Sequence, residues 1–69
     1  MTIKPYTKQE LASMYFPDAN VGNAMRTLNN WISINADLQR ELHATYYNKW
    51  AKNFTSRQVE LIVKYLGEP

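Results

Sequence analysis

The stretch NVGNAMRTLNNWIS, residues 20–33, carries the strongest structural signal in this 69-residue chain. Its apolar residues recur every three or four positions, which places them on one face of an α-helix. They are Val21, Ala24, Met25, Leu28, Trp31 and Ile32. The opposite face is polar and carries a single ion; its residues are Asn23, Arg26, Asn29, Asn30 and Ser33. The pattern predicts an amphipathic helix that begins near Asn20 or Val21.

A shorter helix is predicted before this stretch. Thr7 and Glu10 have the spacing of a capping box, in which each side chain accepts a hydrogen bond from a free backbone N–H group. Apolar residues at helical spacing follow, namely Leu11, Met14 and Tyr15. Pro17 ends the helix, because the residue before a proline avoids helical angles.

A third helix is predicted from Ala36 to about Ala44, with Asn35 as its cap. The segment TYYNKWAKN, residues 45–53, comes next and lacks helical periodicity. It is rich in aromatic residues with polar residues between them, which favours an extended segment or a short hairpin. We therefore expect a short β-ribbon near residues 46–52.

The last helix begins at Thr55, which forms a second capping box with Gln58. Gly67 is placed to end it in the left-handed conformation. Its apolar residues cover about 200° of the helical wheel, wider than a surface helix needs. The helix is either central and packed on two sides, or it presents a spare face to another copy. In a chain of this length we expect the central position.

These elements predict a single, mainly α domain over residues 1–69, a small helix-turn-helix-like bundle of about four helices. So short a chain buries only about 60% of the surface that its unfolded form exposes, so the core must be thin. No apolar run approaches the ~20 residues that span a bilayer, so no membrane contact is predicted. The lack of cysteine fits a reducing compartment, and we expect the cytoplasm.

Catalysis is not predicted, because the residues that it requires are sparse. The chain has one histidine, His43, no cysteine and six scattered carboxylates. A zinc site needs at least three protein ligands, and no spacing in the chain provides them. The only glycines are Gly22 and Gly67, so a glycine-rich phosphate loop is excluded. We expect no enzyme activity, no metal, no cofactor and no small-molecule substrate.

DNA binding is the function that we predict. A helix, a turn and a second amphipathic helix are how helix-turn-helix domains begin, and asparagine and arginine can pair bidentately with adenine and guanine. The ribbon would contact the phosphate backbone as a wing. The predicted contact residues are Asn23, Arg26, Thr27, Asn30, Lys49 and Lys52. The net charge of +2 is low for such a protein, and residues 45–58, which contain no acid, are either a basic patch or a solvated loop.

The sequence also allows two other hypotheses about function. The chain could instead be a protein-interaction or self-association module, a homodimer for example, that docks through Leu61, Tyr65 and the aromatic segment. Four aromatic residues could also stack on single-stranded nucleic acid, namely Tyr46, Tyr47, Trp50 and Phe54. In a chain with so little core material, we expect most of these rings to be buried.

Five features of the sequence occur together: YTKQELA at residues 6–12, YFP at 15–17, Leu28 with Trp31 and Ile32, FTSRQV at 54–59 and YLGEP at 65–69. With these motifs the chain resembles a family of short bacterial proteins known only as a domain of unknown function, which is abundant in gut anaerobes of the Bacteroides type. The resemblance spans nearly the whole chain. It implies a bacterial, stand-alone domain and assigns no site.

The order of elements is also similar to that of the MerR-like winged helix domains of regulators and of phage excision or packaging proteins. There too an early helix with a Glu-Leu-Ala motif, like residues 10–12 of this chain, precedes a recognition helix, an aromatic basic wing and a helix opened by a threonine. This resemblance implies a small regulator or a mobile-element accessory protein. The chain departs from the pattern in its long turn at residues 16–20, its extra helix around Leu38 to Leu42 and its low net charge.

Overall fold

Each helix begins at a capping side chain that the sequence identifies. In the computed structural model, which describes residues 1–48 and 50–69, the caps are Thr7, Asn20, Asn35 and Thr55. Each accepts a hydrogen bond from the backbone N–H three residues later, at 2.8–3.2 Å. Both predicted capping boxes are confirmed.

The described residues form four helices, as predicted. They are α1 (Lys8–Tyr15), α2 (Val21–Ile34), α3 (Ala36–His43) and α4 (Ser56–Leu66). Gly67 ends α4 with a φ of +84°, which confirms the predicted positive φ. Its ψ of 168° is extended rather than left-handed helical, and this region of backbone space is open essentially to glycine alone.

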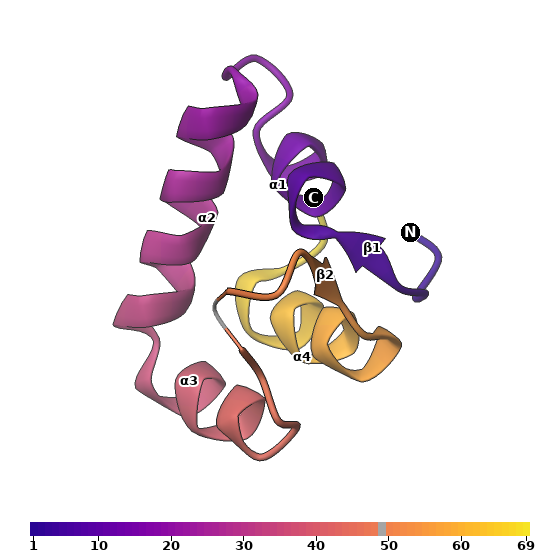
Figure 1. Ribbon diagram of the computed structural model, residues 1–69, viewed down its shortest axis with the longest axis vertical. Helices are drawn as coiled ribbons and strands as arrows, with labels where there is room; N and C mark the ends of the chain where they lie inside the picture. The colour runs from indigo at the N-terminus through magenta and orange to yellow at the C-terminus, as the bar shows by residue number, and fades with distance from the viewer. Residues whose placement is uncertain (49) are drawn as a thin grey trace.

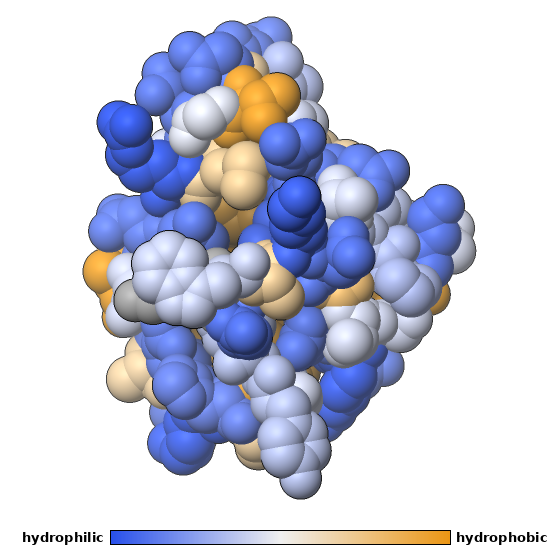
Figure 2. All heavy atoms as spheres, in the orientation of Figure 1, coloured by the Kyte–Doolittle hydropathy of each residue, from blue (hydrophilic) through white to orange (hydrophobic). Residues whose placement is uncertain are grey.

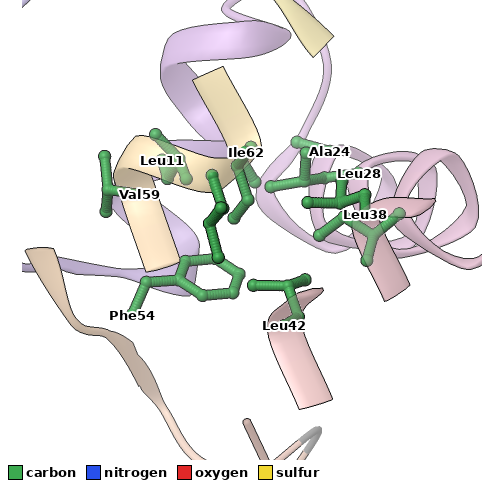
Figure 3. Close-up of a cluster of buried hydrophobic side chains, with 11 residues drawn as sticks. Leu11, Ala24, Leu28, Leu38, Leu42, Phe54, Val59 and Ile62 are labelled. Atoms are coloured by element: carbon green, nitrogen blue, oxygen red, sulfur yellow. The ribbon is translucent and has the colours of Figure 1, made fainter. Parts of the chain in front are cut away.

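The helices surround a thin core. In Figure 1, α2 stands along one side of the molecule, α1 crosses near its N-terminal end, and α3 lies at its C-terminal end. α4 packs against α3 and against the short strand β2 (Asn53–Phe54). The buried hydrophobic side chains come from all four helices and from β2 (Figure 3): Leu11, Ala12, Ala24, Leu28, Ile32, Leu38, Leu42, Phe54, Val59, Leu61 and Ile62.

The wide apolar face of α4 is explained by a central position. Val59, Leu61 and Ile62 are fully buried in the core. Val63 and Leu66, on the remaining part of the face, are partly buried against the same core. Of the two arrangements predicted for this helix, the structure therefore has the one in which it packs on two sides within its own domain.

A small sheet is present, but it does not lie at residues 46–52, where we expected a ribbon. The strands are β1 (Tyr6–Thr7) and β2, which pair antiparallel with Tyr6 opposite Phe54. Between residues 46 and 52, none of the described positions lies in a strand: Tyr46 and Trp50 are in turns, Lys52 is in a bend, and the others are irregular. Tyr46 has a φ of +59°, which no strand accommodates. β2 pairs with β1, near the N-terminus of the chain. The sequence pattern of residues 45–53 does not predict a partner so far away in the chain.

Replacing Thr55 by alanine should destabilise the domain by about 1 kcal/mol, because the first turn of α4 loses its side-chain acceptor. Urea unfolding measures the change. Thr55→Ser is the matched control, since it keeps the hydroxyl and should retain most of the stability. Equal destabilisation by both substitutions would show that the methyl group, and not the cap, is what matters.

Candidate nucleic-acid interface

The outer face of α2 presents most of the side chains predicted to contact DNA. Asn23, Arg26 and Asn30 are exposed. Thr27 is half-buried, and its hydroxyl donates a hydrogen bond to the backbone oxygen of Asn23 at 2.9 Å. Three of the four predicted α2 side chains are thus accessible to a ligand, while the hydroxyl of Thr27 bonds within its own helix.

A groove of about 890 Å³ lies between this face, the C-terminal half of α3 and the loop that connects α3 to β2, which we call the α3–β2 loop. The surface over α2 and α3, at the left of Figure 2, is largely hydrophilic. The groove joins the helix and the aromatic segment, which are far apart in the sequence. Its lining residues are Arg26, Asn29, Asn30, Ile32 and Ser33 of α2, Gln39 and His43 of α3, and Tyr47, Asn48 and Trp50 of the loop.

Among the described residues that line the groove, none carries a carboxylate. Arg26 provides a positive charge, and His43 provides an imidazole ring. The acids of α3 pair elsewhere: Asp37 lies 3.2 Å from Arg40, and Glu41 lies 3.8 Å from Lys64 of α4. The groove is therefore suited to an anionic ligand in spite of the low net charge.

Lys8, the first residue of α1, anchors the α3–β2 loop. Its side chain is buried, and Nζ donates a hydrogen bond to the backbone oxygen of Asn48 at 3.1 Å. The same Nζ lies 4.9 Å from the ring centre of Tyr47 and 5.4 Å from that of Phe54, within cation–π range. Burial lowers the pKa of Lys8. Local sequence gave no sign of this role, since the partners lie some 40 residues along the chain.

The four aromatic residues considered for stacking divide into two pairs. Phe54 is buried, and half-buried Tyr47 stacks on it at 6.1 Å between ring centres. Tyr46 and Trp50 are 96% and 81% exposed. The expectation that most of these rings are buried is therefore wrong, because only Phe54 is fully buried and both Tyr46 and Trp50 are exposed.

Of the two lysines predicted for a wing, the structure describes only Lys52. Lys49 lies outside the described residues. Lys52 is exposed, and its backbone oxygen accepts a hydrogen bond from the backbone N–H of Lys8 at 2.8 Å. Its side chain is not among those that line the groove, so it could contact only a ligand that extends beyond the groove.

The interface predicted for protein binding requires a correction. Leu61 is 1% exposed and fills the core, so it cannot contact a partner. Tyr65 is half-buried, and its hydroxyl donates to a carboxylate oxygen of Glu41. This hydrogen bond lowers the pKa of Glu41 and raises that of Tyr65. The Tyr65 side chain therefore links α4 to α3.

Over residues 1–48 and 50–69, no group of three or more histidine, cysteine, aspartate or glutamate side chains could hold a metal ion. In the same residues, no helix is both long and apolar enough to cross a membrane.

Comparison with known proteins assigns the chain to a family but does not reveal an activity. A family model described as "Domain of unknown function (DUF4248)" matches residues 2–69, which confirms the resemblance to a family of unknown function. No curated protein and no solved structure matches the chain. The groove must therefore be interpreted from its own chemistry.

Replacing Lys8 by methionine should loosen the α3–β2 loop and reduce stability by about 1.5 kcal/mol, the low end for a hydrogen bond to a charged group. Urea unfolding gives the stability, and amide spectra should show changes at Asn48 and Trp50. Lys64→Met, an exposed lysine on α4, is the control and should change little. A loop whose amide signals are unaltered in Lys8→Met would show that Lys8 does not hold it.

Proposed function

We propose that this chain, which belongs to the DUF4248 family of unknown function, binds DNA through the polar face of α2 and the groove beside it. The observation that carries the proposal is the groove lined by Arg26, His43 and the amide side chains of α2, in which none of the described lining residues is acidic. Phosphates attract such a surface through charge, and amide and guanidinium groups can read bases.

The position of α2 supports its role as the reading element. The helix lies at the edge of the molecule, and its outer face is not covered by another element (Figure 1). Asn23, Arg26 and Asn30 occupy this exposed face, whereas Ala24, Leu28 and Ile32 are buried on the other. A helix that is buried on one side and exposes Arg and Asn on the other has the arrangement by which helix-turn-helix proteins enter the major groove.

The α3–β2 loop would take the place of a wing. It flanks the groove, as a MerR-like wing flanks its recognition helix, and it carries exposed Lys52. A role as a regulator or mobile-element accessory protein in the cytoplasm of Bacteroides-type bacteria belongs to the same proposal. It is supported by the order of the elements, not by a matched protein.

Titration with mixed-sequence duplex DNA, followed by amide shifts at low and at physiological salt, tests the proposal. Shifts should cluster on α2 and the groove and weaken as salt rises, because counterion release drives such binding. Arg26→Ala and Asn30→Ala should each weaken binding to a preferred sequence by about 1–3 kcal/mol without unfolding the domain.

Arg40→Ala is the control for Arg26→Ala. Arg40 is equally basic and exposed, but it pairs with Asp37 on α3 and does not line the groove. It should bind as the wild type does. If both variants lose the same amount of DNA affinity, the loss comes from the overall charge of the protein and not from the groove, which contradicts the proposal. An absence of shifts at low salt would also overturn it.

A second candidate is self-association, with a second copy of this chain as the partner. A shallow hollow of about 540 Å³ is lined by Trp31, Ile34, Ala36 and Leu66 together with Asn35 and Asp37. Ile34 is 73% exposed there, which is costly for an aliphatic side chain unless something covers it. The net charge of +2 opposes association of two copies only weakly.

Sedimentation over a range of concentrations tests this candidate. A dimer should be seen, and Ile34→Asp should abolish it by placing a charge in the contact. Val21→Asp is the control, because Val21 is also exposed but lies at the N-terminal end of α2, where an acid is tolerated. A protein that is monomeric throughout would exclude self-association.

A further inference from the structure

Trp50 has an environment that the proposed function leaves unexplained. Its side chain lines the groove and is nevertheless 81% exposed, in a domain whose core is thin. A tryptophan buries more apolar area than almost any other side chain, so leaving one in solvent forgoes stabilisation that a chain of 69 residues could use. Exposed tryptophans that line a groove are a common feature of binding surfaces.

The backbone that carries Trp50 is held in place by Asn48. Oδ1 of Asn48 accepts the backbone N–H of Trp50 at 2.9 Å, and its backbone oxygen accepts the N–H of Ala51 at 3.0 Å. The same backbone oxygen also accepts Nζ of Lys8 at 3.1 Å. These hydrogen bonds fix the backbone at Asn48, Trp50 and Ala51 before any ligand arrives, which lowers the entropy that binding costs.

The opposite side of the groove presents groups that suit a nucleotide. Arg26 can neutralise a phosphate, and Asn29 and Asn30 can donate to or accept from the edge of a base. The volume of about 890 Å³ lies in the range of about 300–1,000 Å³ for pockets that hold drug-sized ligands. A nucleotide fits this scale, whereas a base pair within a duplex does not enter a pocket of this kind.

We propose that Trp50 stacks on an unpaired base of DNA, while Arg26 and the amides of α2 contact its phosphate and edge. The inference rests on the proposed DNA binding and adds to it a preference for DNA that carries unpaired nucleotides. Both faces of a base within a duplex are covered by its neighbours, so only an unpaired or displaced base can stack on Trp50. Stacking on an aromatic ring tolerates any base, since every base has a π-face.

The experiment compares a blunt mixed-sequence duplex with the same duplex carrying an unpaired thymine tail. Trp31→Phe serves as the background, so that Trp50 is the single tryptophan; a phenylalanine can keep an aromatic contact with Phe16. The tail should quench the fluorescence of Trp50 and tighten binding by about 5- to 150-fold, the range that stacking of one base supplies.

Trp50→Ala, followed by fluorescence anisotropy of labelled DNA, should abolish the gain from the tail, which is measured within each variant as the ratio of its dissociation constants for the blunt and the tailed duplex. Tyr46→Ala is the matched control, because Tyr46 is an exposed ring of the same loop that does not line the groove. It should keep the gain, and Trp50→Phe should keep part of it. Amide spectra of each variant verify the fold.

Two results overturn the inference and are distinguishable from each other. If the blunt duplex binds in an Arg26-dependent way but the tail adds nothing, or its gain survives Trp50→Ala, the stacking role is wrong and DNA binding stands. If neither DNA binds at low salt, the proposed function and the inference fall together.

Discussion

The packing of Phe54 in the core is the interaction on which the arrangement of the helices and the loop depends. Its ring is 1% exposed and sits in the core beside Tyr47 and the ammonium group of Lys8. Its backbone pairs with Tyr6 in the small sheet, and the next residue, Thr55, caps α4. Phe54 and the residue after it thus connect the N-terminal strand, the α3–β2 loop and the central helix.

This contact also shapes the candidate site. Because Lys8 and the Tyr47–Phe54 stack hold the α3–β2 loop against the body of the domain, the loop lies beside α2 and the two together form a groove. Trp50 is left exposed at the edge of that groove because the rings that pack inward are those of its neighbours. Tyr47 and Phe54, which pack inward, and Trp50, which stays exposed, therefore come from the same short segment.

The distribution of charge matters more than its sum. A net charge of +2 is small for a protein that binds a polyanion. In the structure, Asp37 and Glu41 form ion pairs with Arg40 and Lys64, away from the described residues that line the groove. Ion pairs at the surface contribute little to stability. Because these two lie outside the groove, the positive charge of Arg26 there is not balanced by an acid among the described lining residues, which the net charge of the chain does not reveal.

The sequence alone determined the four helices and their caps, because periodicity and the Thr7, Asn20, Asn35 and Thr55 caps act within one or two turns of the chain. It determined the buried faces only in part, since Val21 and Trp31 of the predicted apolar face of α2 are exposed. It also identified Arg26 and Asn30 as exposed polar side chains. Only the tertiary structure decided which strand pairs with which, that Leu61 is buried, that Lys8 holds the loop, and that Trp50 stands exposed across from α2. Those outcomes depend on contacts between residues far apart in the chain, and a local pattern holds no information about which distant partner will be close.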